Sequence, residues 1–477
     1  MILKFVPIAE AWILCIMRHK NNMTEINTGR VSTGKIFTIA IPLVLQQLSL
    51  QMQIWIDRAM LGHVDSTFFS AVGNALVPYY AITSVIFSIC GGTTILIAQN
   101  IGAKNEEGSK NYAECAFTGN SIFPLLAFLF FFFGSGSLFK LMGVQSPVLE
   151  YSISYIRILS FTLLLLGPVS TSTSVLQGIG ITKIIMLSGF ANNALNILLD
   201  WILIFGKFGF PKMGMEGAAL ATTISNFVTA PIMIIYVFKS KNIPFKLNIK
   251  KAFLFRWNLY KNVLKIGVPI GLEIGLWHVG NLVLISFLNR LDMMAAGIYT
   301  LIFSIEILPW FLYMGFANAA LTLVGHKTGG DDQKQAVNVG FRCLRVSLII
   351  CAVIAASFLI FPKGILRIFT NDTSLVNYAA IFLMISAGTM FPKAINNVIG
   401  LGIKGMGDTK WLLYTQIFGT IMLITLAYAF IFTAGMGLLG IFIAFLIDET
   451  IRGIINLLRF WKGREIFLLK AFKKIAN

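Results

Sequence analysis

Charged residues are scarce in this chain. Lys, Arg, Asp and Glu together make up 12% of the 477 residues and hydrophobic residues make up 57%, whereas ordinary soluble domains are about 25% charged. A soluble fold of this length would need a polar surface that this composition cannot supply. Long apolar segments such as 122–133 and 158–166 recur throughout. The sequence therefore predicts a polytopic protein embedded in a lipid bilayer.

Several chemical motifs are also missing. The five cysteines are scattered without CxxC spacing, which excludes a recognisable disulfide framework or zinc site. The absence of a Walker-type loop excludes an ATP-driven pump. A membrane-embedded enzyme acting on lipids would need a His/Glu metal cluster or a nucleophile triad, and neither pattern occurs. We therefore expect no enzymatic activity and no cofactor.

What the chain does contain is a tandem duplication. A shift of 227 residues aligns Pro42 with Pro269 and Gly102 with Gly329, and it also aligns the Gly-x-Gly-x-Thr-Lys loop at 178–183 with the loop at 405–410. The offset shortens to 223 near Gly214, because the first copy has four extra residues around 207–211. Each copy is longer than two hundred residues, so a whole lobe is repeated, and this repeat determines the expected fold.

About twenty apolar residues are needed to cross a bilayer, and this length predicts an all-α fold of twelve transmembrane helices in two six-helix lobes. The expected spans are 36–61, 75–99, 115–137, 150–175, 184–206, 215–238, 262–288, 297–324, 338–361, 376–402, 411–433 and 437–460. The expected divisions are an N-terminal segment 1–34, a first lobe 35–238, a basic linker 239–261, a second lobe 262–460 and a C-terminal tail 461–477.

Basic residues predict the orientation, because Lys and Arg accumulate in cytoplasmic loops. The loops and termini on one side hold 28 basic residues and those on the other side hold six. Both termini and the linker are therefore expected in the cytoplasm. The net charge of +18 follows from this bias and gives little support to nucleic-acid binding. Residues 1–22 match no part of the duplication and resemble neither a signal peptide nor a span, so Met23 is a second candidate start.

Ionisable groups inside membrane spans are costly and are functional candidates by default. The first span carries Gln46, Gln53 and Asp57 on one face, and the fifth carries Asn193, Asn196 and Asp200 on one face. The positions that match Asp57 and Asp200 in the second copy are Leu284 and Ala427, so the carboxylate pair occurs in one lobe only.

Helix lengths place both acids, together with Thr222 of the sixth span, at similar depth in the outer half of the first lobe. Such an oxygen-rich group suits a small hard cation or a proton relay. The structural alternative is that Asp57 and Asp200 pair with buried bases such as Arg58 or Arg157.

The second copy has its own polar residues. The candidates for lining a cavity or contacting substrate are Glu273, Trp277, His278, Glu306 and Lys393, together with Gln46, Gln53 and Asn193 of the first copy. The alternative for Lys393 is a structural ion pair with Glu273 or Glu306. A lone histidine in a span is more often a helix–helix hydrogen-bond partner, and the aromatic residues are mostly packing or interface anchors.

These motifs together resemble one family. Four motifs are similar to those of the multidrug and toxic-compound extrusion (MATE) transporters. One is the first span, Ile41-Pro42…Gln46…Gln53…Trp55-Ile56-Asp57-Arg58-Ala59-Met60-Leu61-Gly62. The others are the Asn-x-x-x-Asp segment at 196–200, the Gly217-Ala-Ala-Leu-Ala-Thr222 motif and the duplicated Gly-x-Gly-x-Thr-Lys loops. The resemblance covers about residues 30–465. One departure is Trp277, which stands where a family subgroup carries an acid.

The resemblance implies two lobes and the antiport of organic, often cationic, compounds against H⁺ or Na⁺. It assigns Asp57, Asn196, Asp200 and Thr222 to the cation-coupling group, which would hold Na⁺ if sodium is the coupling ion. It implies a multi-pass, monomeric transporter of small molecules in the bacterial inner membrane. The alternatives are a lipid-linked oligosaccharide flippase of the same superfamily and an exporter of one dedicated metabolite.

Overall fold

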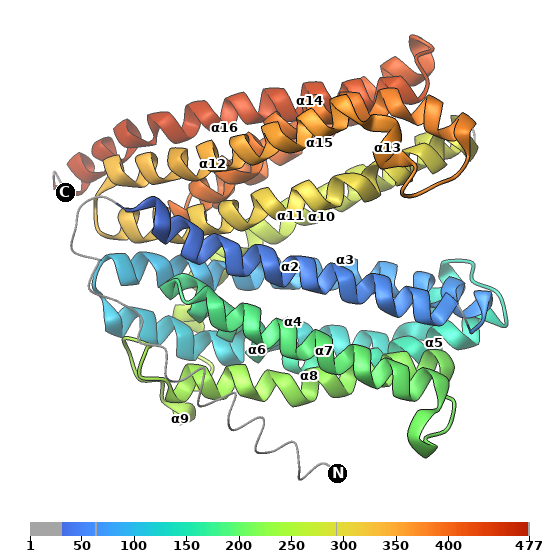
Figure 1. Cartoon of the computed structure of the whole chain (residues 1–477). Coiled ribbons are helices and arrows are strands. Elements are labelled where there is room, and N and C mark those ends of the chain that lie inside the picture. Colours follow the sequence, from blue (N-terminus) through green and yellow to red (C-terminus); the bar gives the residue numbers. More distant parts are fainter. Residues whose placement is uncertain (1–30, 63, 292, 476–477) are drawn as a thin grey trace. The chain divides into compact units, whose positions relative to one another are not determined.

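The computed structural model describes residues 31–62, 64–291 and 293–475, and this part of the chain is helical with no β-strand (Figure 1). The long helices are α2 (Thr33–Gly62), α3 (Ser66–Gly102), α4 (Glu106–Leu141), α5 (Val148–Ser160), α6 (Leu163–Ile179), α7 (Thr182–Phe205), α8 (Gly214–Lys239), α10 (Trp257–Leu291), α11 (Met293–Gly329), α12 (Gln333–Ile360), α14 (Thr373–Gly405), α15 (Thr409–Tyr428) and α16 (Leu438–Ile475). Short helices lie at Lys207–Gly209, Ile249–Ala252 (α9) and Pro362–Leu366 (α13), and a π-helical turn at Ala429–Thr433 follows α15. The all-α prediction is confirmed.

Each predicted span overlaps a helix of the structure. In the described residues, ten helices are long and apolar enough to cross a membrane, and the pair α5 and α6 makes an eleventh if it is counted as one bent span. The remaining helix, α16, is long enough but carries Asp448, Glu449, Arg452 and Arg459. The fourth span was predicted as one continuous helix, but the structure bends it by 45° around residues 161–162. Pro168 removes one backbone hydrogen-bond donor from the turns that follow the bend.

The backbone repeats the duplication seen in the sequence. Gly180 ends α6 at a φ of 93°, and Gly407, 227 residues later, has a φ of 87°. These are left-handed values at which glycine avoids steric strain. The same offset relates the helix caps, because the Asn105 side chain accepts from the backbone N of Gly108 at 2.8 Å and the Asp332 side chain accepts from the backbone N of Gln335 at 3.1 Å. Equivalent turns therefore begin and end equivalent helices in the two copies.

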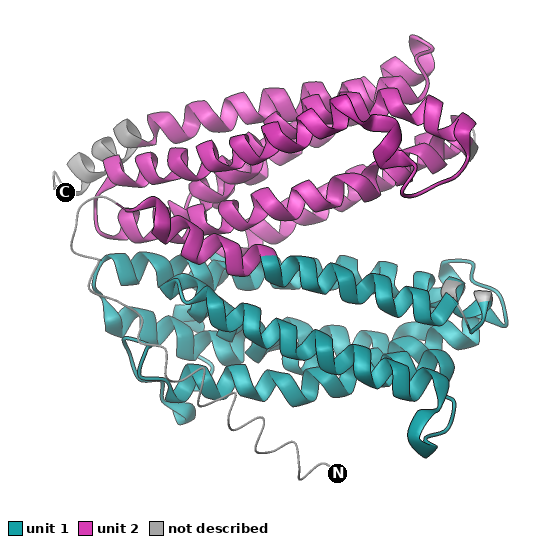
Figure 2. Ribbon diagram, viewed as in Figure 1, with its two compact units in different colours: residues 1–30, 45–265 teal, residues 31–44, 266–477 magenta. Residues whose placement is uncertain are grey.

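The helices form two compact units (Figure 2). The described part of unit 1 is Leu45–Lys265, and unit 2 combines Val31–Val44 with the residues from Ile266 onward. The division falls inside two helices, so the first turns of α2 belong to unit 2 and the first turns of α10 belong to unit 1. Within unit 2, for example, the Phe37 and Phe316 rings meet edge to face at 5.4 Å. Residues 1–22 and the alternative start at Met23 lie outside the described residues.

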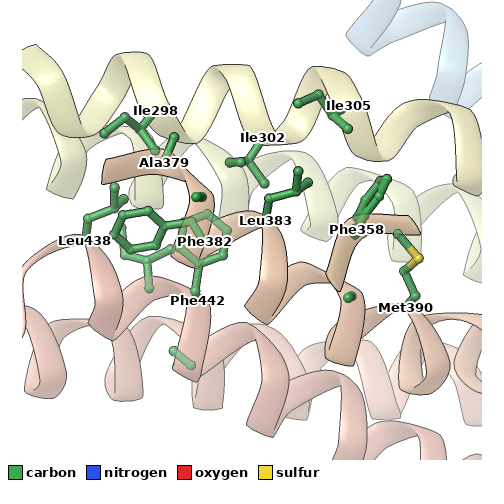
Figure 3. Close-up of a cluster of buried hydrophobic side chains, with 14 of the residues drawn as sticks. Ile298, Ile302, Ile305, Phe358, Ala379, Phe382, Leu383, Met390, Leu438 and Phe442 are labelled. Atoms are coloured by element: carbon green, nitrogen blue, oxygen red, sulfur yellow. The ribbon is translucent and has the colours of Figure 1, made fainter. Parts of the chain in front are cut away.

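Each unit has its own apolar core. In unit 2, Ile298, Ile302 and Ile305 of α11 recur at helical spacing and pack against α14 and α16, as Figure 3 shows. The residues that α14 and α16 contribute there include Ala379, Phe382, Leu383, Met390, Leu438 and Phe442. The core of unit 1 includes Phe131, Phe139, Ile156, Leu163 and Ile204. These cores fix the helices that carry the polar residues described next.

Candidate functional site

A polar cluster lies in unit 1 where α2, α7 and α8 meet. The carboxyl groups of Asp57 on α2 and Asp200 on α7 lie beside each other, within interaction range. The Gln53 amide lies one turn before Asp57, with its nitrogen 3.4 Å from Asp57 Oδ2, and it also contacts the Asn196 amide on α7. The structure thus brings together side chains that are more than 140 residues apart in the sequence.

Asn196 links the two acids to α8. The oxygen and nitrogen of a side-chain amide have nearly the same shape, so hydrogen bonds determine its orientation. The orientation that matches donors with acceptors turns the Asn196 nitrogen towards Asp200 Oδ2 at 3.3 Å. The Asn196 oxygen then accepts from Thr222, from the backbone N at 3.1 Å and from Oγ1 at 3.3 Å. All four residues that the sequence assigned to cation coupling therefore belong to one connected cluster.

The cluster is largely buried, with Asp57 and Thr222 half-buried, and it has no basic partner among the described residues. Asn196 and Asp200 are fully buried, and Gln53 is 6% exposed. None of the ion pairs in the described residues involves Asp57 or Asp200. Arg157, one of the two bases considered as partners, instead donates from Nε to the carbonyl of Phe132 at 3.2 Å. The structure therefore does not show the alternative arrangement, in which a buried arginine would neutralise one of the two acids.

Two carboxyl oxygens in this cluster are buried without a hydrogen-bond donor, Asp57 Oδ1 and Asp200 Oδ1. An unpaired buried oxygen is costly, and the cost is larger when the group is charged. Two carboxylates in contact repel each other strongly in an apolar setting. A proton shared by the pair, or a metal cation bound between them, removes that repulsion. The arrangement thus has the chemistry of a site for one small cation.

Close helix packing holds the three helices in place. A Cβ on Gly217 of α8 would lie 2.9 Å from the backbone oxygen of Leu203 on α7, so only glycine permits this approach. A second polar pair about two turns from the acids bridges α2 and α7, because Asn193 donates to Ser49 Oγ at 2.7 Å. Gln46 lies farther along α2, where its side chain would contact a Cβ added at Gly189. Asn193 and Gln46 thus lie on the α2–α7 contact.

In unit 2, the acids of α10 and α11 are paired with lysines of α14. Glu306 on α11 forms an ion pair with Lys393 at 2.7 Å, which is one of the two pairings that the sequence suggested. Glu273 on α10 pairs with Lys404 at 2.9 Å instead. The expected span ended at residue 402, so Lys404 counted as a loop residue, but α14 continues to Gly405 and buries Lys404 to 7% exposure.

The sequence reasoning missed a second polar network on α16. Arg452 binds Asp448 through Nε, with 3.0 Å to each carboxylate oxygen, and its other nitrogens reach Glu449 at 3.2 Å and Gln416 Oε1 at 2.9 Å. Glu449 also accepts from Asn396 at 2.9 Å. The spacing of 448, 449 and 452 on one helix was the available signal, because residues three and four apart share a face.

A small pocket opens beside this network. Its lining comes from α10, α15 and α16: Trp277, Gly280, Asn281, Leu284, Gln416, Thr420, Leu423, Phe445, Asp448, Glu449 and Arg452. Trp277, a sequence candidate for substrate contact, therefore does line a pocket. His278 lies beside Trp277, with the two rings edge to face and 5.2 Å apart. Within the described residues, no three His, Cys, Asp or Glu side chains are grouped as metal ligands.

The Glu273–Lys404 pair generates a prediction. The Glu273→Gln variant should lower stability by about 3 kcal/mol, because removing one partner leaves a buried unpaired charge. Adding Lys404→Met should recover most of this loss, since the double variant carries neither charge. Thermal unfolding of the purified protein in detergent, read as loss of the monodisperse peak, measures both effects. Lys410→Met, at an exposed lysine, is the control, and equal damage in the single and double variants would contradict a paired role.

Comparisons with known proteins agree with this architecture. The MatE family model matches residues 42–202 and 269–431, one match in each copy of the duplication. An uncharacterized transporter, YisQ of Bacillus subtilis, is 26% identical over 91% of this chain and 94% of its own length. A probable multidrug resistance protein, NorM of Thermotoga maritima, is 25% identical over 93% of this chain and 96% of its own length.

Solved structures of MATE transporters share the fold. A MATE crystal structure in the straight conformation has a TM-score of 0.84 at 21% identity, covering 95% of this chain and all of that one. An outward-facing multidrug resistance MATE family transporter has a TM-score of 0.82 at 22% identity, covering 92% and 96%. The two family matches together span more than half of the sequence. The chain therefore belongs to the MatE family, the multidrug and toxic-compound extrusion transporters.

Proposed function

We propose that this protein is a secondary antiporter that exports organic, chiefly cationic, compounds in exchange for H⁺ or Na⁺. The observation that carries the proposal is the largely buried acid pair Asp57–Asp200, which has no basic partner among the described residues. Family membership and the relatives named as multidrug resistance proteins support drug export as the kind of transport. The coupling ion and the exchange mechanism are the steps that the proposal adds.

Coupling follows from the energetics of the acid pair. Two like charges 4 Å apart repel by roughly 4 kcal/mol at an effective dielectric constant of 20, so an empty, fully ionised pair is unfavourable. A proton shared by the two carboxyl groups, or a Na⁺ between them, removes that repulsion. Loss of the cation restores it and favours a conformation in which the helices separate the acids or expose them to water. The site therefore has two states with different preferred geometries, as alternating access requires.

Exchange requires that cargo and coupling ion favour opposite states. If the ion stabilises one conformation and the cargo stabilises the other, each lowers the affinity for its competitor by the same factor. In this scheme Asp57 and Asp200 hold the ion, Asn196 and Thr222 fix the carboxyl group of Asp200, and the cargo binds elsewhere in the transporter. The other sequence candidates, such as Trp277 and Glu306, remain proposals for contacts with cargo.

The flippase alternative is less well supported. A flippase for lipid-linked oligosaccharides needs unpaired basic groups to hold phosphates. Three basic residues that lie among the helices of unit 2, Lys393, Lys404 and Arg452, are each paired with carboxylates. The net charge in the unit 1 cluster is negative. Both features favour cationic over anionic cargo, without naming the compound.

The central prediction concerns the two acids. Asp57→Asn and Asp200→Asn should each abolish gradient-driven export while the protein still inserts, because an amide can neither exchange a proton nor balance the charge of Na⁺. The double variant should be no worse than either single variant, since both acids serve one site. Export of a fluorescent organic cation from energised vesicles, at matched protein amounts, measures all three.

The control for this experiment is Asn193→Ala, which removes the neighbouring α2–α7 hydrogen bond but leaves the acids in place. It should keep a clear response to the imposed ion gradient. Wild-type export by either single acid variant would show that the pair is not the coupling site.

A second prediction concerns Gln53, which we propose as an additional oxygen ligand because its buried side-chain amide lies between Asp57 and Asn196. The Gln53→Leu variant should weaken Na⁺ binding by roughly tenfold if sodium is the coupling ion, as expected for losing one good polar contact. A proton-coupled transporter would instead keep its response to a pH gradient. Titration of purified protein with Na⁺ at several pH values separates these cases. Unchanged binding of both ions in Gln53→Leu would contradict this role.

We also propose that both termini and the linker face the cytoplasm, on the basis of the 28 basic residues on that side against six on the other. Reporter fusions at Lys246 and at the C-terminus should both show a cytoplasmic location in a bacterial inner membrane. An external reading at either position would refute this orientation. The same purified protein should run as a monomer.

A further inference from the structure

The segment between α8 and α10 has an unusual composition. Residues 239–265 contain seven lysines and Arg256 but no aspartate or glutamate. All seven lysines are exposed: Lys239, Lys241, Lys246, Lys250, Lys251, Lys261 and Lys265. No acidic residue of the segment itself offsets this charge, so it presents a strongly positive surface.

The same segment exposes large apolar side chains. Phe253 is 80% exposed, Ile249 is 60% exposed and Leu254 is 58% exposed. Phe255 and Trp257 follow, at 43% and 55%. These residues lie on and just after the short helix α9, beyond the end of α8 (Figure 1). They therefore lie at the boundary of the membrane-spanning helices, and exposure to water would be unfavourable for so much apolar surface.

A buried acid fixes this segment to the helix bundle of unit 1. Glu114 of α4 is fully buried; it accepts from the backbone N of Asn248 at 2.8 Å and pairs with Arg256 at 3.3 Å. Arg256 also donates to the side chain and backbone oxygens of Asn111, at 2.9 and 3.0 Å. Both ends of α9 are thus attached to α4.

Further contacts complete the attachment. Thr118 of α4 donates to the backbone oxygen of Ala252, and Tyr260 donates to Asn120 at 3.3 Å. The backbone is therefore held against α4, while the lysines and the apolar side chains remain exposed. Arg256 is the one cation of the segment that an ion pair neutralises, among the described residues.

We propose that residues 246–257 form a docking surface for anionic phospholipid at the edge of the bilayer. Aromatic residues prefer the interface between headgroups and acyl chains, where Trp257 and the exposed phenylalanines would insert. Lysines beside them attract negative headgroups, and each lysine near the membrane surface raises the affinity by about tenfold or less. A partner protein would bury the apolar side chains equally well, but the three exposed lysines of this surface, in a segment with seven lysines and no acid, favour a surface of dense negative charge.

The test uses purified full-length protein and counts bound lipids by native mass spectrometry. Wild-type protein should retain phosphatidylglycerol in preference to phosphatidylcholine. The double variant Lys250→Glu/Lys251→Glu should weaken that preference at least about tenfold, because two attractive charges become repulsive. The matched control Lys104→Glu/Lys183→Glu reverses two exposed lysines elsewhere in unit 1 and should keep the preference. Equal loss in both double variants would overturn the assignment to this segment.

A second measurement tests insertion of the apolar side chains. Brominated phosphatidylglycerol should quench part of the tryptophan fluorescence of the wild type, and that part should disappear in Trp257→Phe. Phe253→Ser/Leu254→Ser should weaken lipid retention without lowering the unfolding temperature, since both side chains are exposed. Identical quenching in wild type and Trp257→Phe would overturn the proposal.

Two further outcomes would also overturn it. Displacement of the lipid by soluble glycerol phosphate at similar concentration would show a site for the phosphate alone. Retention of a second copy of the chain, lost in the Phe253→Ser/Leu254→Ser variant, would show a protein interface. Neither outcome bears on ion coupling, which the acid variants test separately.

Discussion

Placing a charge among apolar helices is costly unless a group of opposite charge accompanies it, and this constraint governs the polar residues of both units. In unit 2, Glu306 meets Lys393, Glu273 meets Lys404, and Arg452 meets Asp448 and Glu449. In unit 1, the described residues give Asp57 and Asp200 no basic partner, and the two acids lie beside each other and beside side-chain amides. Negative charge without a basic partner is therefore concentrated at one position where α2, α7 and α8 meet, and this is the position at which we propose that the coupling cation binds.

Much of this could be predicted from the sequence, because its physical causes are local. Runs of apolar residues fix the spans, and helical spacing places Gln53 and Asp57, or Asn196 and Asp200, on single faces. Counting rise per residue from a helix end then places both acids at similar depth. The depth of a residue in the membrane follows from its distance along the helix. Equal depth, together with the shared helix faces, was enough to predict that the two acids lie close together.

The missed features depend on contacts between helices. Lys404 lies two residues past the predicted end of its span, and only the extra turn of α14 shows that it is buried against Glu273. Gln53 looked like one of several polar residues on α2, but its contact with Asn196 connects it to the acid pair. The bend between α5 and α6 was not predicted, because a straight span and a bent span have the same apolar composition. Such information arises from packing, which spacing along one helix does not encode.

The left-handed turns at Gly180 and Gly407 have a consequence for how the two copies have diverged. Their backbone angles have stayed nearly equal, whereas side chains at matched positions have changed from Asp200 to Ala427 and from Asp57 to Leu284. The two halves thus share a common scaffold inherited from one ancestral unit, but only one half retains or has acquired the acid pair. A scaffold held by equivalent turns tolerates different side chains at matched positions, so chemistry can differ between the halves while the backbone stays the same.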